Sequence, residues 1–321
     1  YKEKVLSFIT TTNRKPIKIV VDAGNGIGGK VFDYIFSDKY KTENDPYESI
    51  YENIQIERMY FEPDGTYPNH VPNPMEEENV AEIKKKVVEL DVDFGVAIDG
   101  DADRSFFIDR KGRKPDGVYI GVILSKNLLE NNPENKRIIH DPRITWPFIK
   151  EAQKFGAETH QSVAGHSFFK QAMAEKQALF GAEASAHFYY KDFYNCDSGM
   201  ITTAQMINMY FDGFELTKEV DYLFDNYPNS GEVNYRVENA LGVISKIEEH
   251  YSGMGAKIEK IDGLSVEFED WRFNLRTSNT QPLLRINLEA TTKEKVIEKF
   301  REVESMIGAV RDNLPALEEL R

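Results

Sequence analysis

Three short apolar runs of this chain each end in an aspartate. The runs IKIVVD, FGVAID and KRIIHD place Asp22, Asp99 and Asp141 where a short buried strand would stop. Segments with helical spacing of apolar residues alternate with these runs. Strands that alternate with helices pair mostly in parallel, and ligands bind beyond the carboxyl ends of such strands. We therefore expect an α/β fold with functional groups after these three strands.

Two of the helical segments have a clear apolar face. The apolar positions are Val80, Ile83, Val87 and Leu90 in EEENVAEIKKKVVEL, and Val296, Phe300, Val303 and Ile307 in TTKEKVIEKFREVESMI. Thr291 is expected to cap the second helix with its hydroxyl. Each set of apolar residues is predicted to share one face of its helix.

The last third of the chain changes character. WRFNLRTSNTQPLLRINLEA predicts two strands around a polar turn, and a long helix follows it. Charge, glycine and proline cluster at RKGRKPDG and at DNYPNSGEV, which is typical of domain breaks. We predict two α/β domains, residues 1–116 and 117–231, with mixed, largely parallel sheets sandwiched by helices. A smaller α+β domain is predicted over residues 232–321.

Charge and cysteine content argue against several classes of function. The 321 residues carry a formal net charge of -14, which gives no attractive field for nucleic acid or an anionic membrane. The single cysteine, Cys196, excludes an internal disulfide and is typical of a reducing compartment. The apolar runs are shorter than the roughly 20 residues that span a bilayer. We expect a cytoplasmic protein with small-molecule partners and neither nucleic acid nor membrane.

The string DGDADR places Asp99, Asp101 and Asp103 at alternate positions directly after a predicted buried strand. Three carboxylates turned toward one point repel one another unless a cation lies between them, and Mg²⁺ prefers such oxygen ligands. Arg104 is placed to hold a phosphate beside the metal. A calcium EF-hand is excluded, because Arg104 and Arg110 stand where its loop needs glycine and glutamate. A solvated acidic turn is the structural alternative.

The string DAGNGIGG contains Gly24, Gly26 and Gly29 in the G-x-G-x-x-G spacing of dinucleotide sites. The acidic residue that should follow at a later strand end has no clear counterpart here. Glycines also permit a tight strand-to-helix turn. The structural interpretation is therefore favoured over a nicotinamide enzyme.

Two other segments are rich in hydrogen-bonding groups. The turn RTSNTQPLLR gathers two guanidiniums, hydroxyls and amides that suit a phosphate dianion, although such residues are also common in ordinary turns. Its members are Arg276, Ser278, Asn279, Thr280 and Arg285. In an extended segment, Glu183, Ser185 and His187 would face one side and suit vicinal sugar hydroxyls. The six histidines have no close pair with metal-ligand spacing, which argues against a zinc site.

Together these motifs resemble the α-D-phosphohexomutase family, most closely the bacterial phosphomannomutases. The matching strings, in family order, are DAGNG, EPDGTYPNHVPNP, DGDADR, IIHDPR, GHSFFK, AEASAHFYYKDFYNCDSGM and WRFNLRTSNTQPLLR. The family's enzymes have four domains around a central cleft. The resemblance covers the second, third and fourth.

The resemblance implies a role for each motif. Asp99, Asp101 and Asp103 match the Mg²⁺ ligands, and Arg104 matches a phosphate contact. The remaining matches are Glu183 and Ser185 for the sugar's 3- and 4-hydroxyls, with His187 beside them; Arg143 and His166 for the cleft near the reacting hydroxyl; and Arg276, Ser278, Asn279, Thr280 and Arg285 for the clamp on the non-reacting phosphate.

Two departures from the family pattern matter. Val163 stands where relatives commonly carry lysine, in S-K-T-G-H. The phosphoryl-carrying serine of the family lies in a T-A-S-H-N-P-type loop of the first domain, and the 321 residues contain no Ser-His pair. The opening YKEKVLSFI resembles the connection after that domain. The resemblance thus implies a mutase that interconverts mannose 1-phosphate and mannose 6-phosphate through a phosphoserine and a bisphosphate, here without its N-terminal domain. A non-catalytic sugar-phosphate-binding module is the alternative.

Overall fold

The computed structural model describes residues 1–278 and 282–311. The chain forms two compact units, Tyr1–Asn131 with Ser185–Val220, and Asn132–Ala184 with Asp221–Arg321. Two predicted site residues, Asn279 and Thr280, lie outside the described residues. None of the helices in the described ranges is long and apolar enough to cross a membrane.

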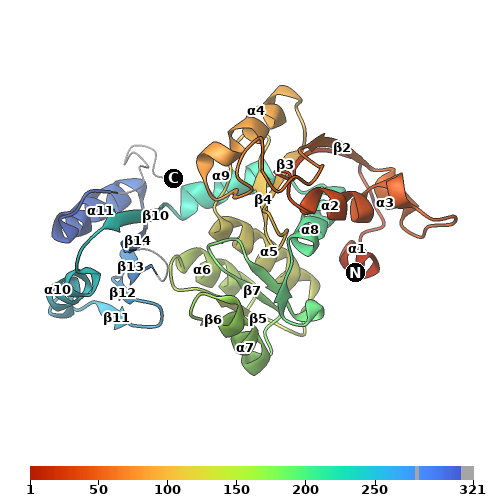
Figure 1. The fold of residues 1–321 in the computed structure, drawn as a ribbon. Helices are drawn as coiled ribbons and strands as arrows, with labels where there is room; N and C mark the ends of the chain where they lie inside the picture. Colours follow the sequence, from red (N-terminus) through yellow and green to blue (C-terminus); the bar gives the residue numbers. More distant parts are fainter. Residues whose placement is uncertain (279–281, 312–321) are drawn as a thin grey trace. The chain divides into compact units, whose positions relative to one another are not determined.

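The first unit is built around a four-stranded sheet in the order β2-β1-β3-β4, of which Figure 1 labels β2, β3 and β4. Strands β1 and β2, and β1 and β3, pair in parallel, whereas β4 pairs antiparallel with β3. The strands are β1 (Ile17–Asp22), β2 (Ile54–Met59), β3 (Phe94–Ile98) and β4 (Ser105–Ile108), with a short antiparallel pair, β8 (Phe188–Tyr190) and β9 (Cys196–Asp197). The helices are α1 (Lys2–Leu6), α2 (Gly28–Phe36), α3 (Glu48–Tyr51), α4 (Ala81–Glu89), α5 (Gly117–Asn131) and α8 (Gly199–Phe211), with 3-10 turns η1 (Asp38–Tyr40), η2 (Glu77–Val80) and η3 (Lys191–Phe193).

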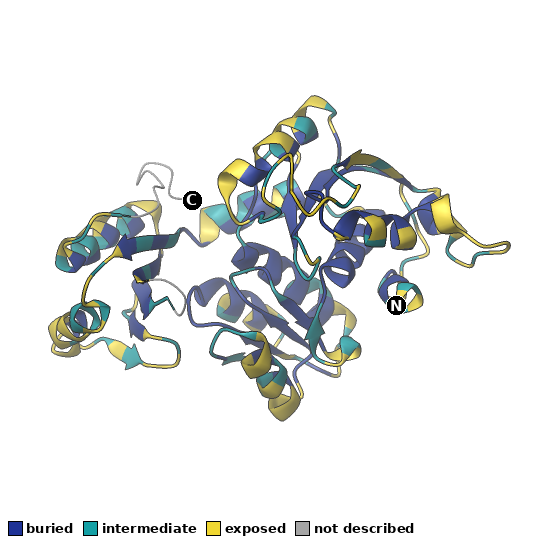
Figure 2. Ribbon diagram, in the orientation of Figure 1, coloured by how far each residue is buried: buried dark blue, intermediate teal, exposed yellow. Residues whose placement is uncertain are grey.

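Burial explains the strand and helix patterns of this unit. Every residue of β3 is buried, as is every residue of α8 (Figure 2). Helix α4 buries Ile83 and Val87, and the preceding η2 turn buries Val80, as the apolar spacing predicts. Leu90, the last position of the predicted face, ends the helix and is only half-buried.

The second unit contains a parallel group of strands and a separate antiparallel sheet (Figure 1). The parallel group comprises β5 (Arg137–His140), β6 (Glu158–Gln161) and β7 (Phe180–Ala182), with helices α6 (Trp146–Lys154) and α7 (His166–Lys176). The antiparallel sheet has the order β10-β14-β13-β12-β11, and its strands are β10 (Asn229–Arg236), β11 (Lys257–Glu259), β12 (Leu264–Glu267), β13 (Trp271–Thr277) and β14 (Leu283–Ala290). Helices α10 (Ala240–Ser252) and α11 (Lys293–Ile307) complete it, and α9 (Leu216–Asn226) contains the last boundary between the units.

The antiparallel sheet has one apolar and one polar face. Alternate residues Phe273, Leu275, Leu284, Ile286 and Leu288 join α10 and α11 in one buried core. The predicted face of α11 is confirmed, since Val296, Phe300, Val303 and Ile307 are all buried. The residues between the apolar ones in β13 and β14 are polar, and they include both arginines of the predicted phosphate clamp.

The predicted N-cap of α11 is wrong by one residue. Thr292, not Thr291, precedes the helix, and its hydroxyl oxygen accepts the N–H of Lys295. The Thr291 N–H instead bonds to the Asp270 carbonyl at 3.0 Å, which keeps Thr291 with the sheet.

The predicted fold class is confirmed. The chain combines α/β layers of mixed, largely parallel strands flanked by helices with a smaller α+β part at its C-terminal end. The domain boundaries at residues 116 and 231 stay a prediction.

Candidate active site

The aspartate loop follows β3 directly and brings its three carboxylates together. One carboxylate oxygen from each of Asp99, Asp101 and Asp103 lies within 4.8 Å of the others. The backbone between them is anchored at Gly100, whose N–H donates to the Pro72 carbonyl at 3.1 Å. The chain thus turns three like charges toward one point, as the alternate spacing predicts.

The charges of this loop are only partly offset. Asp99 is buried, and it accepts hydrogen bonds from the backbone N–H and the Nε of Arg104 at 3.1 and 2.6 Å. Burial raises the pKa of the Asp99 carboxyl above its ordinary value against the opposing charge of Arg104, and the Asp103 carboxylate adds to that rise. Asp103 Oδ1 is buried without a hydrogen-bond partner in the described part of the chain, and Asp101 is exposed.

This donor set fits a magnesium ion. Hard divalent cations take carboxylate oxygens, and an ion here would satisfy the buried Asp103 Oδ1 and offset the mutual repulsion of the three groups. The exposed Asp101 leaves the loop accessible from solvent.

Backbone conformation and close packing explain why glycine stands at the three G-x-G-x-x-G positions of DAGNGIGG. Gly24 has φ +51°, a conformation that L side chains rarely adopt. A Cβ on Gly26 would lie 2.8 Å from the Gly100 carbonyl oxygen, and one on Gly29 would lie 2.6 Å from the Phe61 carbonyl oxygen. The strand-to-helix turn therefore packs directly against the aspartate loop, which supports the structural interpretation of this motif.

His187 belongs to the same unit as the aspartate loop. Its Nδ1 lies 2.9 Å from Asp197 Oδ2 and 3.8 Å from Asp103 Oδ2. Asp197 was not among the predicted site residues, although it stands in the same matching string as His187. Ser185 is half-buried in a turn, and Ala186 has φ 69°, so this segment is not extended and the argument from alternate positions does not apply to it.

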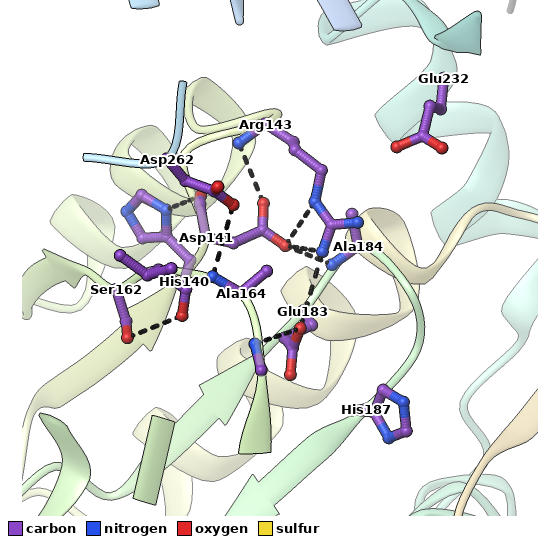
Figure 3. Close-up of polar contacts among 12 residues, drawn as sticks. His140, Asp141, Arg143, Ser162, Ala164, Glu183, Ala184, His187, Glu232 and Asp262 are labelled. Carbon is purple, nitrogen blue, oxygen red and sulfur yellow. Dashed lines mark hydrogen bonds and ion pairs between the residues drawn. The ribbon is translucent and has the colours of Figure 1, made fainter. Parts of the chain in front are cut away.

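In the second unit, Asp141 and Arg143 form a buried ion pair just after β5 (Figure 3). Arg143 donates to Asp141 through its backbone N–H, its Nε and its Nη2, and the first two bonds are 2.9 Å long. Burial alone would raise the pKa of Asp141, but the charge and hydrogen bonds of Arg143 lower it, with help from the Ala184 N–H at 2.7 Å. Asp141 raises the pKa of Arg143 in turn. The pair stays ionised and fixes the guanidinium.

Glu183 directly follows β7 and is buried. One of its carboxylate oxygens accepts the Gly165 N–H at 3.1 Å and lies 3.8 Å from Arg143 Nη2 (Figure 3). His166 begins α7 next to Gly165 and is exposed. The structure thus brings together the predicted residues Arg143 and Glu183, and it places His166 beside the Gly165 amide that binds Glu183.

The predicted phosphate clamp lies on the polar face of the antiparallel sheet. Arg276 of β13 and Arg285 of β14 are directly paired across the two strands. Ser278 Oγ accepts from Arg285 Nη2 at 3.3 Å. Glu232 of β10 contacts both arginines, with 3.0 Å from its carboxylate to each. Sequence reasoning missed Glu232, because only the strand order brings β10 to this place.

Comparison with known proteins identifies the family. Residues 1–112 match the model of phosphoglucomutase/phosphomannomutase alpha/beta/alpha domain II, residues 116–227 match domain III, and residues 232–305 match the C-terminal domain. The chain belongs to the phosphoglucomutase/phosphomannomutase family. The resemblance inferred from the motifs is therefore confirmed.

Curated members of this phosphohexomutase family align over most of the chain. A phosphomannomutase of Salmonella montevideo is 39% identical over 293 residues, which are 90% of this chain and 62% of the relative. A protein of Xanthomonas campestris pv. campestris (strain B100) named "Phosphohexose mutases" is 36% identical over 311 residues, 96% of this chain and 66% of the relative. The chain thus spans less than two thirds of the length of these relatives.

A solved structure agrees with the fold. A phosphoglucomutase/phosphomannomutase family protein from Burkholderia thailandensis superimposes with a TM-score of 0.79 at 26% identity, and the match covers 98% of this chain and 65% of that chain.

Proposed function

We propose that these residues supply the metal, sugar and phosphate contacts of a phosphohexomutase that interconverts mannose 1-phosphate and mannose 6-phosphate. The observation that carries the proposal is the convergence of Asp99, Asp101 and Asp103 at the end of β3. Relatives named phosphomannomutase at 37 to 39% identity support mannose as the sugar. The glucose phosphates are the second pair of substrates to test.

Asp99, Asp101 and Asp103 would hold Mg²⁺. When bound, the ion would offset negative charge on a phosphoryl group that passes to or from a sugar hydroxyl. Arg104, whose Nε donates to Asp99, would contact the same phosphoryl group with the rest of its guanidinium.

The other groups would bind the sugar and its second phosphate. Glu183 is an acceptor for sugar hydroxyls, and Ser185 and His187 are assigned to the same task from their match to the family. Arg143 is held as a permanent cation by Asp141, so it can stabilise an oxyanion without changing its protonation. Arg143 and His166 are assigned to the reacting hydroxyl.

The phosphate that does not react would bind the clamp on β13 and β14. Arg276 and Arg285 present adjacent guanidiniums there, and Ser278 adds a hydroxyl. Asn279 and Thr280 belong to the same proposed clamp. Because a bisphosphate must turn over between the two half-reactions, the clamp has to accept the phosphate from either end of the sugar.

The phosphoryl carrier is proposed to lie outside these 321 residues. The family's serine motif has no counterpart in the sequence, and without an acceptor neither half-reaction can start. We expect the chain by itself to bind phosphosugars and to show no sustained turnover.

Phosphorus NMR of mannose 1-phosphate with Mg²⁺ and catalytic glucose 1,6-bisphosphate tests both the mutase activity and the proposal that the phosphoryl carrier lies outside this chain. For the 321-residue chain we expect no formation of mannose 6-phosphate above an Asp101→Asn control. Sustained conversion above that control would show that the chain holds its own acceptor. The full-length product of the gene, assayed in the same way with both sugar 1-phosphates, should convert mannose 1-phosphate. A full-length product that binds the phosphosugar without conversion would leave the sugar-phosphate-binding module as the function.

A further inference from the structure

Glu232 bridges the two arginines of the proposed clamp. Its Oε2 lies 3.0 Å from Arg276 Nη2, and its Oε1 lies 3.0 Å from Arg285 Nη1. Each carboxylate oxygen therefore accepts from a different guanidinium. Two cations lie side by side on paired residues of neighbouring strands, and a carboxylate from a third strand joins them.

Both guanidiniums are nevertheless incompletely bonded. The Nε atoms of Arg276 and Arg285 are buried and have no hydrogen-bond partner in residues 1–278 and 282–311. Arg276 is only 8% exposed. Buried N–H groups without partners are costly, so these donors point to an anion that binds beside Glu232. Glu232 is more exposed than Arg276, with 23% of its side chain exposed.

We propose that Glu232 is the internal counter-anion of the phosphate clamp. It holds the like-charged arginines together when no phosphate is bound, and it competes with the phosphate for the same N–H groups. This inference rests on the proposed function, because it assigns Arg276 and Arg285 to a substrate phosphate. It goes further by naming the group that sets how tightly the clamp holds that phosphate.

The charges of the three side chains predict how the Glu232 carboxylate changes the affinity of the clamp for phosphate. Two guanidiniums and one carboxylate carry a net charge of +1, whereas the arginines alone carry +2. A phosphate dianion that bonds to the arginines must approach the Glu232 carboxylate, which lies 3.0 Å from each guanidinium, and two anions brought together in a partly buried site repel each other. Removal of the negative charge therefore favours phosphate. A mutase has reason to keep a weaker clamp, because the bisphosphate must leave it and turn.

Glu232→Gln is the matched test, since glutamine has the same length and keeps one acceptor for one arginine. Inorganic phosphate and mannose 1-phosphate are titrated separately into the 321-residue chain by calorimetry at low salt. We expect Glu232→Gln to bind both probes about tenfold more tightly than the unchanged chain. Glu238→Gln removes the same charge from an exposed position just after β10 and should change affinity less than twofold. An equal gain in Glu238→Gln would attribute the effect to net charge and overturn the proposal.

Arg276→Ala separates this inference from the proposed function. If Arg276→Ala abolishes phosphate binding while Glu232→Gln leaves it unchanged or weakens it, the clamp stands and the role of Glu232 is wrong. If Arg276→Ala binds both probes as well as the unchanged chain, the clamp itself is wrong, and the role of Glu232 falls with it. Should Glu232→Gln fail to fold, as judged by its circular dichroism, Glu232→Ser removes the same charge and carries the same expected sign.

Discussion

Arg272 of β13 and Glu289 of β14 form a buried ion pair, with 2.8 Å between Nη1 and Oε1. Arg272 also donates to the carbonyl oxygens of Pro142 and Arg143, at 2.8 and 3.1 Å. Glu289 accepts the backbone N–H of Thr145 at 2.8 Å, where α6 begins. The pair thus ties the sheet of the proposed clamp to the loop that carries Arg143.

We expect Arg272→Met to lower the free energy of unfolding by about 3–5 kcal/mol, because it leaves the buried Glu289 charge without its partner. The double variant Arg272→Met with Glu289→Met should recover a large part of that loss, since neither charge then remains buried. Urea denaturation of both variants and of Glu289→Met alone gives the coupling energy. Purely additive losses would show that the two charges do not depend on each other.

Thr292→Ala should destabilise the chain by about 1 kcal/mol, because it removes the side-chain oxygen that accepts the Lys295 N–H at the start of α11. Thr291→Ala is the matched control, one residue earlier and also exposed, and should change stability by less than about 0.5 kcal/mol. Thermal unfolding followed by circular dichroism distinguishes the two. The reverse order of effects would restore Thr291 as the cap.

His140 should make the stability of the chain depend on pH below neutrality. Burial lowers the pKa of His140 to about 4, and its ring stacks on Phe148 at 5.3 Å between centroids. The unfolded state takes up a proton below about pH 6.5 that the folded state refuses until about pH 4, so stability is full above pH 6.5 and falls as the pH drops. Between pH 7.5 and pH 5 this amounts to about 2 kcal/mol.

His140→Asn keeps an amide N–H near the Nδ1 position for the Asp141 carbonyl but cannot titrate. We expect its loss of stability between pH 7.5 and pH 5 to be smaller than that of the unchanged chain by that same amount. Urea denaturation at the two pH values measures it. An equal loss in both proteins would assign the pH dependence to other groups.

Asp101→Asn should weaken Mg²⁺ binding at least tenfold, because it removes one of three carboxylates that lie within 4.8 Å of one another. The side chain is exposed, so the melting temperature should stay nearly constant. Titration calorimetry with MgCl₂ checks this, with the exposed Asp38→Asn as the control for loss of one charge elsewhere. Equal Mg²⁺ affinity in Asp101→Asn and Asp38→Asn would contradict the metal assignment.

Local sequence patterns predicted whatever depends on neighbouring residues. Asp22, Asp99 and Asp141 stand at or directly after the ends of strands, because a run of apolar residues followed by polar ones sets where a buried strand stops. Alternate aspartates converge on one loop for the same local reason. The cap of α11 marks the limit of such reasoning. Thr291 and Thr292 carry the same side chain, and only the bond of Thr291 to Asp270 in the sheet decides which of them begins the helix.

The sequence by itself determined the family, the alternation of strands and helices, and the residues that meet through short spacing, since each depends on order along the chain. Only the tertiary structure decided that Glu232 joins Arg276 to Arg285, that Asp197 contacts His187, and that Arg272 binds the loop of Arg143. Strand order brings Glu232 to the two arginines, the antiparallel pairing of β8 with β9 brings Asp197 to His187, and the packing of β13 against the loop after β5 brings Arg272 to Arg143. A charge acts on every charge nearby in space, and a pattern along the sequence does not show which charges will be near one another.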